Sequence, residues 1–334
     1  MKKKILIITQ IVDKNDPILG FFHSWILEFA KNFESVIVVC LKKGEYNLPS
    51  NVEVLSLGKE EGVSRIKYLT RFYKYIFSKK NNYDSVFVHM NPIYVILGGV
   101  FWKMTGKRIA LWYTHKNVDM KLRLAEKLCD SVFSASKESF RLPSKKLHIM
   151  GHGIDTSKFS VINRDRDHRK IVSIGRVSIY KNYEPLLEAI SILKKEGFET
   201  KLSIVGPEDK NYKKKLLNLI DSLNIYDRVE FLGPISQDKI PTIYNDANIF
   251  VNLSKTGSLD KAILEAMSCG LNVLTSNEAM SYMPEKNKCS ENPQEIAQKI
   301  KYLSDLGIDS QARDFVTKNH ELVDLIKKIK DHIL

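Results

Sequence analysis

Apolar runs of strand length alternate with amphipathic segments of helical length along almost the whole chain. Residues 4–9 and 83–89 are runs of the first kind, whereas residues 22–32 and 183–197 place apolar side chains at helical spacing. This alternation predicts parallel sheets with helices on both faces, which is an α/β architecture. A charge-rich segment, residues 163–170, interrupts the pattern before it restarts, so we interpret it as a linker between two Rossmann-like domains.

The restart divides the chain into three predicted parts. Residues 1–160 form an N-terminal Rossmann-like domain, residues 161–315 form a second one, and residues 316–334 form a C-terminal helix that packs back towards the first domain. In sheets of this kind, ligands bind beyond the carboxyl ends of the strands. We therefore expect the functional residues in the loops that follow the strands.

The balance of charges points to an anionic partner. Lysine and arginine outnumber the acidic residues by 52 to 39 among 334 residues, which gives a formal net charge of +13. Nucleic acid, acidic lipid and phosphorylated substrates are the partner classes that such a surplus favours. The chain has no aromatic–basic motif typical of RNA or DNA binding, so we expect no nucleic-acid partner. Its four cysteines lack zinc or disulfide spacing, which favours a reducing cytoplasm.

One basic segment, residues 64–80, could contact a membrane. It contains six cations and no acidic residue. Helical spacing places five apolar side chains on one stripe, which consists of Ile66, Leu69, Tyr73, Ile76 and Phe77. This pattern predicts either an interfacial helix on an anionic membrane surface or a helix that packs on the sheet with solvated cations. We expect a cytoplasmic protein, with peripheral contact to the inner face of the membrane in the first case.

The strongest candidate site lies between residues 254 and 270, where a polar loop leads from a buried strand into a helix. The loop Thr256-Gly257-Ser258 offers backbone N–H groups at the positive end of the helix, which favours a nucleotide diphosphate. Glu265 lies in the helix, where its carboxylate can accept hydrogen bonds from ribose hydroxyls. An ordinary crossover helix with a solvated Glu would give the same pattern, so this stretch alone leaves both interpretations open.

A second candidate follows the first strand of the second domain. Arg176 and Lys181 lie five positions apart in a loop that enters a helix, so both can contact one diphosphate, the arginine as a planar fork and the lysine as a point charge. Two solvated cations are the alternative. In the first domain, His89 ends a strand and, together with Asn91, either contacts an acceptor or closes the strand.

These motifs, in this order, resemble the retaining nucleotide-sugar glycosyltransferases of family 4, which have the GT-B fold. The resemblance is strongest between residues 151 and 276. It implies two facing Rossmann-like domains with an interdomain cleft, the first for the acceptor and the second for the donor. The motifs that carry it are Gly153-Ile-Asp155, Gly175-Arg176 with Lys181, residues 228–233 and 240–247, and Leu264-Glu-Ala-Met-Ser-Cys-Gly270.

The resemblance also implies roles for individual residues. Arg176 and Lys181 would bind the donor diphosphate and stabilise the leaving group, and His115 would approach the donor sugar as a third catalytic residue. Glu265 matches the second Glu of the family's E-x7-E motif and would hold the donor ribose, while the base would lie near residues 233–235. The donor-binding set implied in this way is Gly20, Gly175, Arg176, Lys181, Gly206, Gly233, Pro234, Ile235, Gly257, Ser258, Leu259, Asp260 and Glu265.

The chain departs from the family pattern at the first position of the E-x7-E motif, which is Gly257 instead of Glu. Asp260 could substitute for the missing carboxylate, and it is equally suited to cap the helix that follows. Asp165-Arg-Asp167 has the spacing of a D-x-D metal motif but falls in the predicted linker. We therefore expect neither a metal nor a cofactor.

The function expected from these residues is that of a metal-independent, retaining glycosyltransferase. It would move a sugar, with UDP as the favoured nucleotide, to a glycan or lipid-linked acceptor in cell-surface polysaccharide or glycolipid synthesis. Two alternatives stay open: a nucleotide-sugar epimerase of the same fold, and a non-catalytic nucleotide-sugar-binding subunit, which Gly257 would favour.

Overall fold

A computed structural model describes residues 3–162, 166–255 and 257–334 of the protein. The chain divides into two compact units. Unit 1 combines Met1–Gly153 with Glu321–Leu334, and unit 2 is Ile154–His320. The domain boundaries predicted from the sequence, after residues 160 and 315, lie a few residues from the boundaries in the structure.

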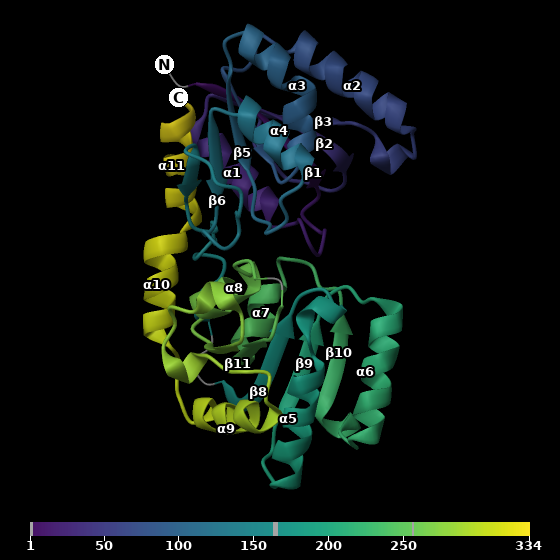
Figure 1. Cartoon of the computed structure of the whole chain (residues 1–334), viewed down its shortest axis with the longest axis vertical. Coiled ribbons are helices and arrows are strands. Elements are labelled where there is room, and N and C mark those ends of the chain that lie inside the picture. The colour runs from purple at the N-terminus through teal and green to yellow at the C-terminus, as the bar shows by residue number, and fades with distance from the viewer. Residues whose placement is uncertain (1–2, 163–165, 256) are drawn as a thin grey trace. The chain divides into compact units, whose positions relative to one another are not determined.

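Unit 1 is built on a sheet of seven parallel strands in the order β3-β2-β1-β4-β5-β6-β7 (Figure 1). Most of these strands read as continuous apolar runs because helices cover both faces of the sheet. The strands are β1 (Lys4–Val12), β2 (Ser35–Lys43), β3 (Val52–Ser56), β4 (Ser85–His89), β5 (Arg108–Trp112), β6 (Ser131–Ser134) and β7 (Leu147–Ile149). The helices are α1 (Phe22–Asn32), α2 (Arg65–Ser78), α3 (Pro92–Met104), α4 (Met120–Leu128) and α11 (Leu322–Ile333).

Alternate residues of the central strands pack against different helices of unit 1. Val86 and Val88 belong to one core cluster together with side chains of α2, α3 and α4. Phe87, between them, instead contacts Phe29 of α1 with ring centroids 5.2 Å apart. Helix α11 packs against α1 and against strands β5 and β6. The C-terminal helix is therefore part of the core of unit 1.

Unit 2 contains a sheet of five parallel strands in the order β10-β9-β8-β11-β12 (Figure 1). Helices α5, α6 and α9 share one core cluster with the sheet, and α10 packs against α8. The strands are β8 (Asp167–Ile174), β9 (Lys201–Val205), β10 (Val229–Gly233), β11 (Ala247–Asn252) and β12 (Asn272–Thr275). The helices are α5 (Glu184–Lys195), α6 (Lys210–Ser222), α7 (Ile240–Asn245), α8 (Lys261–Ser268), α9 (Pro293–Ser304) and α10 (Ser310–His320).

The prediction of a linker through residue 170 is wrong. Asp167 already pairs with Ala247 of β11, and Lys170 pairs with Lys201 of β9, so the charged residues before Ile171 form the first half of β8. Arg166 is buried, and its guanidinium donates a hydrogen bond of 2.9 Å to the side-chain oxygen of Asn245. Residues 163–165, and with them the first Asp of the D-x-D motif, lie outside the described residues.

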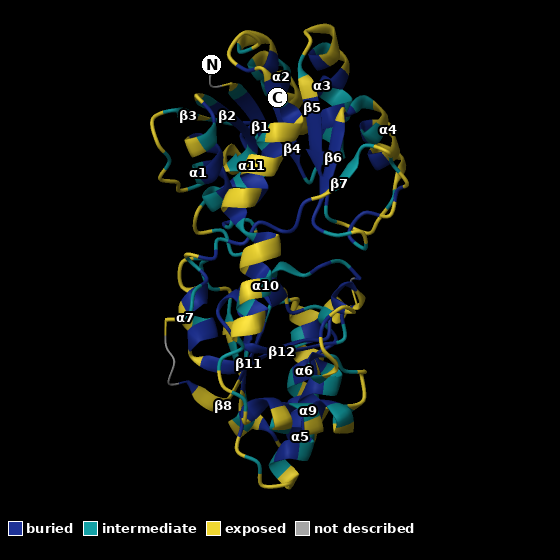
Figure 2. Cartoon of the chain, turned by 90° about the vertical axis from the view of Figure 1, so that its left-hand side faces the viewer, coloured by how far each residue is buried: buried dark blue, intermediate teal, exposed yellow. Residues whose placement is uncertain are grey.

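Of the apolar stripe that the sequence predicts for α2, only Ile76 is fully buried, together with Phe72, which flanks that stripe. Phe72 and Ile76 face the core, whereas Ile66 is 76% exposed, and Leu69 and Phe77 are also exposed. The helix thus packs on the sheet and still presents apolar side chains and cations to solvent. Figure 2 shows exposed stretches on both α2 and α3. Among the described residues, no helix is both long enough and apolar enough to cross a membrane.

Candidate functional site

In each sheet the strand order reverses at one point, and many of the predicted site residues follow the strands that flank it. The order reverses between β8 and β11 in unit 2, and between β1 and β4 in unit 1. Ligands of open parallel sheets bind beyond the carboxyl ends of the strands at such a point, because the flanking loops diverge there. The loops after β8 and β11, residues 175–183 and 253–260, are therefore the expected binding loops of unit 2.

Glycines shape the strand ends of unit 2. The N–H of Gly175 donates to the carbonyl of Val205 at 2.9 Å, and the N–H of Gly206 donates to that of Gly233 at 2.8 Å. A Cβ on Gly206, where φ is +141°, would lie 2.1 Å from the carbonyl oxygen of Gly175. A Cβ on Gly175 would lie 2.7 Å from Cε of Lys181. The absence of side chains here lets two loops approach each other and leaves room for Lys181.

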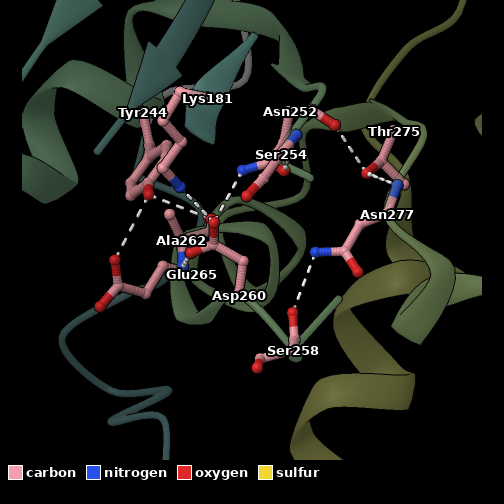
Figure 3. Close-up of polar contacts among 10 residues, drawn as sticks. All are labelled: Lys181, Tyr244, Asn252, Ser254, Ser258, Asp260, Ala262, Glu265, Thr275 and Asn277. Carbon is pink, nitrogen blue, oxygen red and sulfur yellow. Dashed lines mark hydrogen bonds and ion pairs between the residues drawn. The ribbon is translucent and has the colours of Figure 1, made fainter. Parts of the chain in front are cut away.

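Lys181 and Asp260 form an ion pair that joins the two binding loops of unit 2 (Figure 3). Their side chains expose only 14% and 18% of their surface. The carboxylate of Asp260 also accepts hydrogen bonds from Nδ2 of Asn252 at 3.0 Å and from the backbone N–H of Ala262 at 3.4 Å. Asp260 is thus the N-cap of α8, one of the two roles that its sequence position allows.

The surroundings of Asp260 favour its ionised form. Burial alone raises the pKa of this carboxyl group, but the charge of Lys181 and the hydrogen bonds from Lys181, Asn252 and Ala262 outweigh the effect of burial. The pKa of Asp260 therefore lies below its usual value. At neutral pH the carboxylate is charged and balances the positive charge of Lys181.

Arg176 lies in the same loop as Lys181 and is held quite differently. Its side chain is exposed and makes no hydrogen bond or ion pair with the rest of the described chain. The backbone around it is fixed, because Val177 donates to the carbonyl of Pro207 at 2.8 Å and accepts from the N–H of Asp209 at 2.9 Å. An exposed cation on an anchored loop is well suited to contact an incoming anion.

The loop after β11 is held by the neighbouring strand end (Figure 3). Nδ2 of Asn277 donates to the carbonyl of Ser258 at 3.0 Å, and the hydroxyl of Thr275 donates to the carbonyl of Asn252 at 2.8 Å. Gly257 has φ +62°, a left-handed conformation that glycine adopts without strain. Leu259 is buried, and Thr256 lies outside the described residues.

Glu265 is buried inside α8 and both of its carboxylate oxygens have partners. One oxygen pairs with the ammonium of Lys261, one turn earlier, and the other accepts a hydrogen bond of 3.3 Å from the hydroxyl of Tyr244. Burial, and then the charge of Glu265, raises the pKa of Tyr244 well above its usual value, so this hydroxyl stays a donor. A ribose at Glu265 would have to share the carboxylate with these two side chains.

Several polar residues of the site escape the sequence motifs. Asn252 is a buried amide at the end of β11, directly after three apolar residues, and that contrast in the sequence could have identified it. Tyr244 and Lys261 give no comparable signal. Asn182, with φ +52°, places a buried side-chain N–H₂ group beside Lys181 that has no hydrogen-bond partner among the residues described. At the predicted base site, Gly233 has φ +68° and open space around it, Pro234 is exposed, and Ile235 is half-buried.

In unit 1, His89 is a buried residue at the end of β4. Its Nδ1 lies 3.2 Å from the hydroxyl of Thr9, and its ring stacks on Phe22 with centroids 4.1 Å apart. Burial, with a smaller contribution from His152, lowers the pKa of His89 to about 3. The imidazole is therefore neutral at physiological pH. Gly20, which the sequence places in the donor site, is buried in the loop before α1 and donates to the carbonyl of Asp16 at 3.0 Å.

The two remaining predicted residues of unit 1 follow β4 and β5. Asn91 precedes the first turn of α3 without capping it through its side chain. His115 is exposed, and its Nδ1 accepts a hydrogen bond of 3.1 Å from the N–H of Asn117. Met90, directly before Asn91, has a φ of +62° that is rare for a non-glycine residue, and its sulfur accepts hydrogen bonds from Thr114. Strained backbone of this kind often marks a functional site, and the sequence gives no hint of it.

No group of three or more His, Cys, Asp or Glu side chains within the described ranges could hold a metal ion. The charged groups near the reversal point of unit 2 include the cations Arg176, Lys181 and Lys261, with Asp260 and Glu265 as counter-charges of the two lysines. The arrangement can bind an anion through the two loops and a hydroxyl-bearing group through the carboxylates.

Comparison with known proteins identifies a family and several relatives. A family model described as Glycosyl transferases group 1 matches residues 154–320, which is half of the chain. Mannosylfructose-phosphate synthase from Agrobacterium fabrum is 26% identical over 165 residues, which cover 42% of this chain and 36% of the relative. The amylovoran biosynthesis glycosyltransferase AmsK from Erwinia amylovora is 29% identical over 145 residues, covering 41% and 35% respectively. The matched part thus spans about a third of these curated relatives.

A solved structure resembles the whole chain. It is Alr3699/HepE from Anabaena in complex with UDP and glucose, with a TM-score of 0.77, 17% sequence identity and coverage of 98% of both chains. At this identity the likeness concerns the fold alone. It confirms the predicted class, a GT-B arrangement of two Rossmann-like α/β domains.

Proposed function

Because the chain belongs to the glycosyl transferases group 1 family, we propose that it transfers a sugar from a nucleoside-diphosphate sugar to a hydroxyl group of a glycan or lipid-linked acceptor. The observation that carries this proposal is the pair of loops at the reversal point of unit 2. One of these loops contains Arg176 and Lys181, two cations that can bind a diphosphate. The relative AmsK, named for amylovoran biosynthesis, supports a role in polysaccharide or glycolipid synthesis.

In the proposed reaction, the bond between the anomeric carbon and the diphosphate oxygen breaks, and a bond to the acceptor oxygen forms on the same face of the sugar. The acceptor proton passes to the departing phosphate, so no protein base is required. Arg176 and Lys181 stabilise the charge that develops on the leaving group, which is an electrostatic form of catalysis. Family 4 membership and retention of anomeric configuration are parts of this proposal.

UDP is the favoured nucleotide. The base would lie against the backbone of Gly233–Ile235, where the open space at Gly233 leaves room for a flat ring. The ribose would bind at Glu265 in competition with Lys261. The complex of Alr3699/HepE with UDP and glucose shows that a protein of this fold accommodates this nucleotide.

A membrane surface would present the acceptor, with the protein on the cytoplasmic side. Helices α2 and α3 lie side by side, because the hydroxyl of Tyr73 donates to the carbonyl of Leu97 at 3.2 Å and the rings of Phe77 and Phe101 are 4.7 Å apart. Their outer surface carries exposed apolar side chains. Both helices contain cations and neither contains an acidic residue, which favours attraction to an anionic leaflet. The exposed apolar residues are Ile66, Leu69, Phe77, Val100 and Met104.

A thermal-shift panel of UDP-, GDP-, ADP- and CMP-linked sugars tests the proposed donor class, because a ligand that binds only the folded state raises the unfolding midpoint. We expect one UDP-sugar to raise the midpoint and the others to leave it unchanged. Stabilisation by none of the four would refute the proposal, and stabilisation by another nucleotide would refute the preference for UDP.

The alternative of a non-catalytic binding subunit has one observation in its favour, Gly257 at the position of the family's first Glu. Release of UDP from the stabilising UDP-sugar, measured with and without a crude lipid-linked acceptor fraction, separates it from an enzyme. UDP release and transfer of the labelled sugar to the lipid fraction are expected. Conversion of the donor into a free isomer without acceptor would instead identify an epimerase.

A further inference from the structure

Asp260 is an unusual neighbour for the proposed diphosphate site. Phosphate oxygens and a carboxylate repel each other, yet this carboxylate lies at the N-terminus of α8 and pairs with the lysine that the donor would use. The pair bridges the two loops at the reversal point of unit 2. Asp260 thus places a negatively charged hydrogen-bond acceptor where an anionic ligand needs hydrogen-bond donors.

The contacts of Asp260 hold it firmly in this position. Its Oδ2 accepts from Lys181 and from Asn252, and its Oδ1 accepts from the backbone of Ala262. The amide of Asn252 is itself fixed, because its oxygen accepts a hydrogen bond of 3.2 Å from the N–H of Ser254. The ammonium of Lys181 has three N–H donors, so it can keep one on Asp260 and offer another to a phosphate.

We propose that Asp260 is a resident counter-ion that positions Lys181 in the empty site and weakens the hold of that lysine on the diphosphate. This inference rests on the proposed function. A partly buried lysine needs a partner, and Asp260 supplies it before the donor binds. When the diphosphate arrives, Lys181 divides its attraction between the two anions. The nucleotide product therefore leaves more readily than it would from an uncompensated lysine.

Two other roles for Asp260 make different predictions. If the carboxylate replaces the missing Glu at Gly257 and binds a sugar hydroxyl, its loss should weaken a UDP-sugar and leave UDP unaffected. If it only caps α8, replacement by another good N-cap residue should change neither ligand. Asp260→Asn separates the three roles, since Asn caps helices about as well as Asp and keeps an acceptor for Lys181.

The experiment measures UDP and inorganic pyrophosphate binding by calorimetry, together with the unfolding midpoint of the ligand-free protein, for the wild type, Asp260→Asn and Lys181→Met/Asp260→Asn. In Asp260→Asn we expect a lower midpoint, because Lys181 loses its counter-ion, and roughly tenfold tighter binding of UDP and pyrophosphate, because one negative charge beside the site is gone. The double variant should regain stability relative to Asp260→Asn and should bind both ligands more weakly than Asp260→Asn does. In steady state, Asp260→Asn should lower both KM and kcat if product release limits turnover.

Unchanged or weaker UDP binding by Asp260→Asn, in the presence of measurable binding by the wild type, would overturn the inference and leave the proposed function intact. Absence of UDP and pyrophosphate binding in all three proteins would overturn both. If Asp260→Asn does not fold, Asp260→Ser provides the same comparison, because Ser also caps helices and carries no charge.

Discussion

At the scale of single residues, the two cations proposed to bind the diphosphate differ in how the fold holds them. Arg176 is exposed and makes no bond to the other residues described, whereas Lys181 is largely buried and paired. The sequence predicts that both bind one diphosphate but cannot distinguish their contributions to stability. The structure distinguishes them. Of the two, only Lys181 forms an ion pair within the described chain, and its removal would leave Asp260 without a counter-charge.

Arg176→Ala should impair activity without affecting folding. Loss of one donor to the developing charge typically costs about 2.7–4 kcal/mol of transition-state stabilisation, so kcat/KM should fall by about 10²–10³-fold. The free energy of unfolding, measured with urea, should change by less than about 0.5 kcal/mol, as for other exposed residues. Lys214→Ala on α6, which removes an exposed cation far along the chain from the binding loops, is the control and should retain full activity. Activity within a few-fold of wild type would exclude Arg176 from the mechanism.

Lys181→Ala should destabilise the protein in a pH-dependent manner. The fold lowers the pKa of Asp260, so the pair contributes stability above the usual carboxyl pKa of about 3.9 and loses it as pH falls through the lower folded value. Without the lysine, burial alone would raise the pKa of Asp260. The loss in unfolding free energy should be about 2 kcal/mol or more at pH 7 and should shrink towards pH 3. A loss that is the same at both pH values would mean that Lys181 contributes packing and not charge.

Gly206→Ala should be more harmful than an alanine at another left-handed glycine. Its Cβ would overlap the carbonyl oxygen of Gly175, whereas a Cβ on Gly197, at φ +72°, would meet no atom within 4 Å. Gly197→Ala, as the matched control, should cost only the backbone strain of about 1–2 kcal/mol. Urea unfolding should show a larger loss for Gly206→Ala, and its nucleotide binding should weaken because the loop of Arg176 must shift. Equal losses would show that the two loops separate without cost.

The sequence identifies many of the residues at this scale but few of their partners. Arg176, Lys181 and Asp260 are recognisable because they occupy motif positions beside predicted strand ends. The ion pair between Lys181 and Asp260 joins residues 79 positions apart, and nothing in either local segment specifies it. The same holds for the hydroxyl of Tyr244, which reaches Glu265 from α7.

At the scale of the elements, the pattern of apolar and polar residues does not predict a strand correctly where that segment is exposed on both faces. The first half of β8, Asp167–Lys170, is exposed and charged, so it lacks the apolar run by which the other strands are recognised. In α2 the pattern gives the helix but not its orientation. Aromatic and aliphatic residues cover more than one face, and only contact with the sheet determines that Phe72 is buried and Ile66 is not.

The exposed face of α2 should bind anionic membranes. Lys67 and Lys74 are exposed and unpaired in the described chain, whereas Arg71 is engaged by Glu61 through two hydrogen bonds of 2.9 and 2.7 Å. In a flotation assay with anionic liposomes, Lys67→Glu/Lys74→Glu should lower the partition coefficient by at least about 30-fold, from about 1 kcal/mol for each cation lost.

The matched control for this variant is Lys210→Glu/Lys214→Glu on α6 of unit 2, which makes the same change in net charge. It should leave binding nearly unchanged. Neutral liposomes should bind none of the three proteins appreciably. Equal weakening by both double variants would show that net charge, and not the α2 face, is responsible for the attraction.

At the scale of the whole molecule, the two-domain α/β architecture is the part that the sequence predicts best. Repeated alternation of strands and helices over hundreds of residues is compatible with few other folds. The two parallel sheets confirm the predicted architecture. The site is predicted less fully, because its loops belong to no periodic element and their conformations depend on tertiary hydrogen bonds such as those from Asn277 and Thr275.

Activity should not depend on a divalent metal, because two cationic side chains are proposed to stabilise the leaving group. In the presence of EDTA, the rate of UDP release should stay within about twofold of that in buffer alone, since no step of the proposed reaction uses a metal ion. A known metal-dependent transferase run in parallel controls for the efficiency of chelation. Loss of activity that magnesium or manganese restores would contradict the role assigned to Arg176 and Lys181.

The order in which the chain is synthesised gives α11 a further importance. Unit 1 needs this helix, whose Leu325, Ile326 and Ile329 are buried, but the ribosome makes it only after all of unit 2. At about 5–20 residues per second, the first segment of unit 1 waits on the order of ten seconds or longer with that surface uncovered. During translation we therefore expect the apolar side chains of α1, β5 and β6 that α11 later covers to be exposed. Completion of unit 1 is in this way coupled to the prior synthesis of unit 2.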